Sequence, residues 1–275
     1  MNPIVDSHQH FWRLDRGDYG WLTPALEPIY RDFMPADLAP QLARAGVGAT
    51  IAVQAAPTVA ETRFLLQLAR ENRFIAGVVG WVDFESPNAV ESMAELAADV
   101  NLVGLRPMIQ DIPDPEWMLR QEFDPVFEAM IDHGLVFDAL VKPQHLPALR
   151  ELVARYPDLK TVVDHAAKPP LATGNLAEWK REMTQLAVAS EVVCKVSGLV
   201  TEAGSADAPR LTECFDHLLQ TFGAQRLMWG SDWPVCELVC SYEDWRRTSG
   251  TLFSRLSFAE REQIHSTVAR QTYGI

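Results

Sequence analysis

Short apolar runs rich in valine, isoleucine and leucine recur along the chain roughly every 25 to 45 residues. Runs of this length and composition are typical of strands in a parallel sheet that is covered on both faces. Read as strands, they occupy residues 3–8, 49–55, 75–82, 102–108, 135–141, 161–165, 192–198 and 226–232.

Amphipathic segments lie between these runs, and their apolar residues return every three to four positions, as on one face of a helix. The clearest are residues 61–73, 88–100, 145–157 and 175–190. Strands that alternate with helices in this number predict an α/β fold, a closed (β/α)8 TIM barrel. An open doubly wound sheet is the rival, but its glycine-rich phosphate loop is absent after the first strand. No linker or shift in composition divides the chain, so residues 1–275 are expected to form a single domain.

One connection, at about residues 11–34, is much longer than the others and carries Trp12, Tyr19, Trp21 and Tyr30. Long loops inside compact domains are often lids or binding loops. The alternative is that these aromatic side chains only plug the barrel mouth or pack on neighbouring helices.

The chain has 24 basic and 37 acidic residues, a formal net charge of -13. Such a surface repels nucleic acid and anionic lipid, so neither is expected as a partner. No apolar run is long enough for a membrane span, and none reads as a signal peptide, so a cytoplasmic location is expected. Cys194, Cys214, Cys236 and Cys240 are too few and too irregularly spaced for a disulfide framework, and no second half of a zinc site follows the last pair.

Two histidines, His8 and His10, end the first strand in the stretch VDSHQHFW. Because side chains alternate along a strand, they are expected to project in one direction together with Ile4 and Asp6. If that face is the barrel interior, both imidazoles lie at the carboxyl end of the barrel, where such enzymes place their catalysis. The pair could belong to a metal site, work as an acid–base pair without metal, or be structural.

Polar residues at the ends of other strands support a functional reading. His165 ends the run TVVDH and Asp232 ends RLMWGSD, so a closed barrel would bring both of them to the histidine pair. Arg106, in LVGLRPM, would also lie near the mouth, where it could bind a carboxylate, carbonyl or hydroxyl group. Taken singly, each is as well explained by a cap, a surface position or a structural ion pair.

Several of these stretches together resemble a known family. DSHQHFW followed by YGWL, the DH that ends a middle strand, GLRP, WGSDWP and the closing VARQTYGI look like the lactonase branch of the amidohydrolase superfamily. That branch holds sugar lactonases of the fuconolactonase and rhamnonolactonase type and is related to 2-pyrone-4,6-dicarboxylate lactonase. The resemblance spans essentially the whole chain. It implies a (β/α)8 barrel that hydrolyses a small cyclic ester, here a sugar-acid lactone.

Compared with binuclear members of the superfamily, this sequence offers ligands for few metal ions. Binuclear members of the superfamily use a bridging residue and histidines from two successive strands, whereas the strand before TVVDH offers Asp138 and Lys142 but no histidine. We therefore expect one divalent ion at most, zinc before manganese, held by His8, His10 and Asp232. The resemblance further implies that the ion can be dispensable.

The expected chemistry has two versions. Without metal, Asp232 acts as general base on a water molecule, and His8, His10 and His165 polarise the carbonyl group as negative charge develops. With metal, a single ion polarises the carbonyl and activates water, and the histidines that bind it are neutral.

Further residues are candidates for substrate contacts. Arg106 and Lys142 offer positive charge, and Trp21 and Trp233 offer flat faces that stack on sugar rings. Lys195 lies within a strand, where it either reaches the substrate or forms a buried ion pair.

Other functions are compatible with the same barrel. They are a lactone isomerase, a metal-dependent decarboxylase and a non-catalytic binding barrel, and none of them is excluded by the residues alone.

Overall fold

A computed structural model describes residues 3–206 and 209–275 and contains one parallel sheet. Its eight strands are paired with their sequence neighbours in the order β1 to β8, each pair parallel. The strands are β1 (Ile4–Gln9), β2 (Val47–Val53), β3 (Ile75–Gly80), β4 (Leu102–Leu105), β5 (Val136–Ala139), β6 (Thr161–Val163), β7 (Val193–Val196) and β8 (Leu227–Trp229). Each expected run overlaps one of these strands, so the predicted barrel is confirmed.

The barrel is closed between its first strand and the segment that follows its last strand. Gln9 forms a parallel bridge with Trp233. The amide of Asp232 donates to the carbonyl oxygen of His8 at 2.8 Å, and the amide of His10 donates to the carbonyl oxygen of Trp233 at 2.7 Å. The two ends of the chain are thus joined at the residues expected to carry the chemistry.

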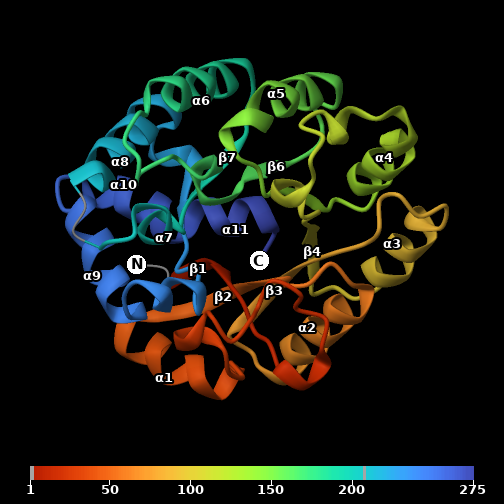
Figure 1. The fold of residues 1–275 in the computed structure, drawn as a ribbon, viewed down its shortest axis with the longest axis horizontal. Helices are drawn as coiled ribbons and strands as arrows, with labels where there is room; N and C mark the ends of the chain where they lie inside the picture. Colours follow the sequence, from red (N-terminus) through yellow and green to blue (C-terminus); the bar gives the residue numbers. More distant parts are fainter. Residues whose placement is uncertain (1–2, 207–208) are drawn as a thin grey trace.

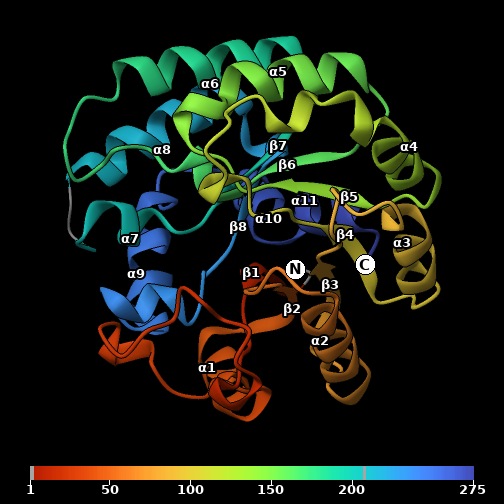
Figure 2. The ribbon, with the colours of Figure 1, turned by 45° about the vertical axis from the view of Figure 1, so that its right-hand side comes forward.

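Helices surround the strands on all sides (Figure 1), and the turned view in Figure 2 shows α5 and α6 on one side of the sheet and α1 and α2 on the other. The four amphipathic segments correspond to α2, α3, α5 and α6. The helices are α1 (Pro35–Ala45), α2 (Val59–Glu71), α3 (Ala89–Ala97), α4 (Asp124–Asp132), α5 (Leu146–Arg155), α6 (Ala177–Ala189), α7 (Leu199–Ala203), α8 (Pro209–Phe222), α9 (Tyr242–Leu252), α10 (Phe258–Glu262) and α11 (Val268–Tyr273).

The interior of the barrel is filled by β-branched residues and by the last helix. Val5, Val79, Val136, Val162 and Met228, from strands all around the barrel, form one buried cluster. Val268, Ala269 and Tyr273 of α11 belong to the same cluster, and Figure 1 shows this helix lying across the middle of the ring. The C-terminal helix therefore covers the end of the barrel opposite the expected site.

A β-bulge interrupts the regular alternation of β1. Asp6 is paired with Thr50 and Gln9 with Ala52, so β1 advances three residues while β2 advances two. One extra residue reverses the phase of all side chains that follow it.

The bulge corrects the expectation that Ile4, Asp6 and His8 share one face. Val5 lies in the interior cluster, whereas the carboxylate of Asp6 accepts a hydrogen bond from Tyr242 of the outer helix α9. After the bulge, His8 points inward. The two histidines reach the mouth because of this shift in phase, and Asp6 does not accompany them.

The long first loop is a folded segment. Trp12 is fully buried and forms an antiparallel bridge with Phe33, which ties the two ends of the loop together. Tyr19 is also buried and donates from its hydroxyl to Glu61 of α2 at 2.7 Å. Trp21 remains 37% exposed, and its ring meets that of Trp12 edge to face. Most of the aromatic residues in this loop therefore anchor it, and Trp21 is presented by it.

Two expectations about the chain as a whole can be compared with the structure. Cys194, Cys214, Cys236 and Cys240 form no disulfide bond. Among residues 3–206 and 209–275, no helix combines the length and apolar character needed to cross a bilayer.

Candidate active site

Three imidazoles and one carboxylate meet at the carboxyl end of the barrel. The Nε2 atoms of His8 and His10 are 3.2 Å apart. Oδ1 of Asp232 lies 3.3 Å from Nε2 of His10, 3.7 Å from Nε2 of His8 and 3.8 Å from Nε2 of His165. Residues from β1, from the turn after β6 and from the segment after β8 are thus brought together, as the sequence predicts.

Neighbouring groups fix which nitrogen of each histidine carries the proton. Nδ1 of His10 lies 2.7 Å from the carbonyl oxygen of Val53, which can only accept, so this nitrogen is the donor. Nδ1 of His8 faces both Oδ1 of Asp164 at 3.3 Å and Nζ of Lys195 at 3.2 Å. Its Nε2 faces the guanidinium of Arg106 at 3.4 Å, which can only donate, so Nε2 carries the lone pair. In their neutral forms, both histidines therefore direct an Nε2 lone pair toward Asp232.

Burial sets the charges of the site. It lowers the pKa of His165 to about 4, and it lowers the pKa of His8 well below its ordinary value despite the nearby Asp164. Burial alone would raise the pKa of Asp232, but the facing imidazoles outweigh it and the pKa of this carboxyl falls below its usual range. At neutral pH the site consequently combines an ionised carboxylate with neutral His8 and His165.

This donor set fits one metal ion. Two lone-pair nitrogens and a carboxylate oxygen converge at 3.2, 3.3 and 3.7 Å. Two ligands of one tetrahedral zinc ion, each about 2.1 Å from it, lie about 3.4 Å apart. Three acceptors that face one another repel unless a cation or proton lies between them. His8, His10 and Asp232 also form one of the candidate metal groups among the described residues.

A second ion next to the first is disfavoured. The neighbouring group of His8, Asp164 and His165 has suitable spacing. However, Oδ1 of Asp164 already lies 3.0 Å from Nζ of Lys195, and its Oδ2 lies 3.3 Å from the guanidinium of Arg106. A metal there would meet two positive charges.

His165 is held by an unusual stretch of backbone. Four consecutive residues that are not glycine, His165, Ala166, Ala167 and Lys168, have φ between 50° and 57°. This left-handed conformation is costly for residues with a Cβ atom and is maintained only when its surroundings impose it. The indole of Trp179 on α6 donates to the carbonyl oxygen of Ala166 at 2.7 Å and so anchors the turn.

Two glycines make room for the imidazoles. A Cβ atom at Gly198, whose φ is 66°, would lie 2.6 Å from Nδ1 of His165. A Cβ atom at Gly230 would lie 2.8 Å from the Cβ atom of His8. The side chain of Ser197 contacts Nδ1 of His165 at 2.9 Å, which orients the ring from the same side. Residues that follow β7 and β8 therefore shape the places of histidines from other strands.

Lys195 lies beneath the site and not in it. Its side chain is 0% exposed, and its Nζ lies 2.5 Å from Asp138, 3.0 Å from Asp164 and 3.2 Å from Nδ1 of His8. The hydroxyl of Tyr273, on the C-terminal helix, donates to Asp138 at 2.9 Å. The expected substrate contact of Lys195 is therefore replaced by its alternative, a buried ion pair, because two carboxylates hold the amine inside the barrel.

Arg106 borders the site but is held mainly by protein groups. One guanidinium nitrogen contacts both Asp164 and His8, and the other donates to the carbonyl oxygen of Gln54. The side-chain Nε2 of Gln54 in turn donates to the main-chain carbonyl oxygen of Arg106 at 2.7 Å. The arginine is thus fixed at the edge of the cavity with its charge beside His8.

A cavity of about 340 Å³ opens above these groups. Trp21 forms part of its wall, and its indole donates to the carbonyl oxygen of Ala55 at 2.7 Å. The cavity is lined by His10, Trp21, Leu26, Ala55, Arg106, Met108, Gln110, Asp111, Leu140, His165, Lys168, Asp232, Val235 and Leu238. The lining combines apolar side chains with charged and amide groups.

Two other expected substrate contacts are absent from this lining. Trp233 is fully buried, and its ring packs against Phe11 and Phe33, so neither face is open to a ligand. Nζ of Lys142 donates to the carbonyl oxygen of Gln110 at 2.8 Å, outside the cavity wall. Stacking and charge therefore have to come from other residues.

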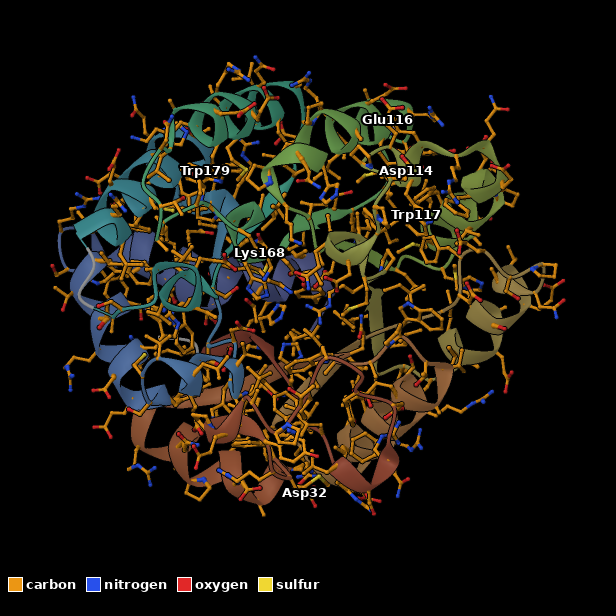
Figure 3. The ribbon with its side chains drawn as sticks, in the orientation of Figure 1. Asp32, Asp114, Glu116, Trp117, Lys168 and Trp179 are labelled. Atoms are coloured by element: carbon orange, nitrogen blue, oxygen red, sulfur yellow. The ribbon has the colours of Figure 1, made fainter. Side chains whose placement is uncertain are left out.

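Lys168, Gln110 and Asp111 line the cavity although the sequence did not single them out. Figure 3 shows Lys168 near the middle of the ring of helices, closer to its centre than Trp179 is. Its Nζ contacts Glu202 at 3.1 Å. In the sequence, the feature that could have identified Lys168 as a cavity residue is its position three residues after His165, in the turn that follows a strand.

The fold and the site define a class of protein. A (β/α)8 barrel with a histidine–aspartate centre at the carboxyl ends of β1, β6 and β8 is suited to activating a carbonyl group toward water. The chain belongs to the amidohydrolase family, whose sequence model matches residues 5–275. The predicted resemblance is confirmed.

Two proteins named as lactonases and one solved structure are similar to this chain over most of its length. An L-fucono-1,5-lactonase of Burkholderia ambifaria is 48% identical over 246 residues, 89% of this chain and 85% of that protein. An L-fucono-1,5-lactonase of Burkholderia multivorans is 38% identical and covers 98% of this chain and 96% of its own length. An amidohydrolase of B. multivorans solved with bound Zn has a TM-score of 0.91 at 38% identity, with 99% of each chain covered.

Proposed function

We propose that this enzyme hydrolyses the 1,5-lactone of a sugar acid, such as L-fuconolactone, to the open hydroxy acid. The observation that carries the proposal is the ionised Asp232 beside three imidazoles at the floor of a cavity of about 340 Å³. The two lactonases with which this chain shares 48% and 38% identity support the choice of a cyclic ester. The cavity is of the size that small-molecule sites have.

Asp232 acts as the general base. Its Oδ1 faces the three imidazoles, which leaves Oδ2 for a water molecule in the cavity. Because its pKa lies below the usual range, the carboxylate is ionised whenever substrate is present at neutral pH. The water gives its proton to Oδ2 as its oxygen attacks the lactone carbonyl, and the same proton then passes to the ring oxygen as the C–O bond breaks.

His165 polarises the carbonyl group. With the hydroxyl of Ser197 donating to its Nδ1, the neutral ring carries its proton on Nε2, which points toward Asp232 and the cavity. This N–H donates to the carbonyl oxygen as negative charge develops there, which is worth on the order of 3 kcal/mol in other enzymes. Arg106 places a fixed positive charge at the same edge of the cavity.

His8 and His10 do not act as donors in this scheme, because their protons are on Nδ1 and their lone pairs face Asp232. Together with Asp232 they would hold one zinc ion. When bound, that ion supplies Lewis acidity to the ester carbonyl. Hydrolysis of an activated cyclic ester by Asp232 and His165 does not require it, so we propose that the metal assists and is dispensable. Without the ion, a proton takes its place among the three facing acceptors.

The substrate lies with one face of its ring against Trp21 and the apolar wall. Its hydroxyl groups meet Lys168, Gln110 and Asp111, which offer both donors and acceptors. A polyhydroxylated ring suits this mixed wall better than a long acyl chain does.

The test is turnover of a panel of 1,5- and 1,4-aldonolactones, followed as acid release with a pH indicator. We expect release from L-fucono-1,5-lactone and smaller rates for epimers. Absence of acid release from every member of the panel would contradict the proposal.

Proton NMR of the products separates hydrolysis from isomerisation. A hydrolase gives the open acid directly, whereas an isomerase gives another lactone first. A 1,4-lactone that forms before any free acid appears would reassign the enzyme as an isomerase.

A further inference from the structure

A second cavity, of about 240 Å³, lies at the other end of β1, away from the catalytic histidines. Ile4, the first residue of that strand, forms part of its wall, together with residues of α9 and of the segment that begins at α10. It is lined by Ile4, Arg246, Gly250, Phe253, Phe258, Arg261, Glu262, His265 and Ser266. None of these residues takes part in the proposed hydrolysis.

Two arginines face this cavity without a carboxylate partner. Within the described ranges, neither Arg246 of α9 nor Arg261 of α10 forms a salt bridge, and Glu262 in the same wall pairs with neither. Arg261 donates to the carbonyl oxygen of Leu256 at 2.5 Å, and Arg246 lies over the ring of Trp229 at 5.5 Å. Both guanidinium groups are therefore oriented but not neutralised, in a chain that carries 37 acidic residues.

Two nitrogen atoms at the cavity are buried and have no hydrogen-bond partner. They are Nε of Arg246 and Nδ1 of His265. A buried polar atom without a partner costs about 1 to 3 kcal/mol, so most buried polar atoms in folded proteins have one. Burial and the two arginines lower the pKa of His265 to about 4, so the ring is neutral at physiological pH.

The backbone around His265 is also unusual. Gln263–Thr267 form a single turn of π-helix between α10 and α11. Such turns are rare and frequently occur at functional sites. The turn places His265 and Ser266 in the wall of the same cavity as Arg246 of α9.

The rest of the lining is apolar, with Ile4, Phe253 and Phe258, the last of which is 53% exposed. We propose that this cavity binds a small organic monocarboxylate, with its anionic group between Arg246 and Arg261 and its apolar body against the two phenylalanines. The carboxylate neutralises the two guanidinium groups, which form no salt bridge within the described residues, and accepts hydrogen bonds from them.

Benzoate and its neutral isostere benzamide test the site on the full chain by isothermal titration calorimetry. We expect benzoate to bind with one site per chain and benzamide at least about tenfold more weakly, because the charged hydrogen bonds are lost. Arg246→Gln and Arg261→Gln should each weaken benzoate binding at least about tenfold. Arg247→Gln is the matched control, since Arg247 lies on the same helix but is exposed and paired with Asp244.

A crystal structure of the benzoate complex locates the ligand directly, even if one arginine variant does not fold. Density between Arg246 and Arg261 supports the proposal. The proposal is overturned by equal affinity for benzoate and benzamide, by no binding at all, or by density only in the cavity above Asp232.

Discussion

The main-chain amide of Asp232 donates to the carbonyl oxygen of His8 at 2.8 Å, although 223 residues lie between them in the sequence. This hydrogen bond belongs to the small set that closes the barrel. The contact that closes the barrel therefore also brings Asp232 next to His8. Changes at either residue are expected to affect both the closure of the barrel and the geometry of the site.

Replacement of Asp232 tests the base. Asp232→Asn keeps the size of the side chain and removes its ability to accept a proton, so we expect kcat to fall about 10²- to 10⁴-fold with little change in KM. Steady-state kinetics on the preferred lactone measure the effect. Asp114→Asn, at an exposed acid that pairs with Arg120 outside the cavity wall, is the control and should leave kcat within about threefold. Near wild-type kcat in the Asp232 variant would remove this residue from the mechanism.

Replacement of His165 tests carbonyl polarisation. His165→Asn is expected to lower kcat at least about tenfold, since the Nε2 donor is lost from the developing oxyanion. Ser197→Ala removes only the group that orients the ring, and its effect should be smaller and in the same direction. If both variants keep the wild-type rate, His165 has a structural role.

Metal binding and metal requirement can be measured separately. Calorimetry on chelator-treated protein should show one zinc ion per chain, and His10→Ala should abolish that binding because a converging ligand is lost. We expect the chelated enzyme to keep most of its activity. Complete loss that zinc restores would show that the ion is essential and would replace the metal-free scheme.

The buried network that ends at the C-terminal helix should influence the site. Tyr273→Phe deletes the hydroxyl that donates to Asp138, the partner of Lys195, and so leaves a buried carboxylate with one hydrogen bond fewer. We expect a loss of about 1 to 3 kcal/mol in unfolding free energy and a several-fold fall in kcat with KM unchanged. Tyr156→Phe is the matched control, because its hydroxyl donates to Asp124 at the periphery. If Tyr273→Phe and Tyr156→Phe changed kcat equally, the hydroxyl of Tyr273 would have no specific influence on His8.

Glu61 should make stability depend on pH. Burial raises the pKa of this carboxyl from 4.5 to about 7, despite the hydrogen bond from Tyr19. Because the folded pKa lies above the unfolded one, the stabilising effect is complete below about 4.5 and is lost as pH rises through about 7. The unfolding free energy of the wild type relative to Glu61→Gln should fall by up to about 3 kcal/mol over that range in urea titrations. A constant difference would mean that Glu61 titrates normally.

The hydrophobic pattern was sufficient for the barrel because each strand is short, β-branched and followed by a helix. It also indicated that His8, His10, His165 and Asp232 lie close together, since each lies in or just after the carboxyl end of a strand and these ends share one face of the barrel. The pattern could not predict which side chains of β1 point into the barrel, because a β-bulge has no signature in a run such as IVDSHQ.

Substrate contacts were harder to predict for a related reason. Lys195 and Lys168 are the same residue type near the ends of neighbouring strands, but one is held between Asp138 and Asp164 and the other faces the cavity. Which of them reaches a ligand depends on partners more than 25 residues away in sequence. Trp233 likewise lost its expected role because the folded first loop, through Phe33, covers its ring.

The left-handed turn from His165 to Lys168 limits how this enzyme can diversify. Glycine, asparagine, aspartate and small residues tolerate such a backbone better than most side chains do, and a β-branched side chain at position 166 or 167 would force the turn open. The two alanines there touch no ligand, yet random mutagenesis should recover few active variants at either position. Changes of substrate preference are therefore expected to arise in the first loop around Trp21, which carries no such restriction, while the turn remains nearly invariant.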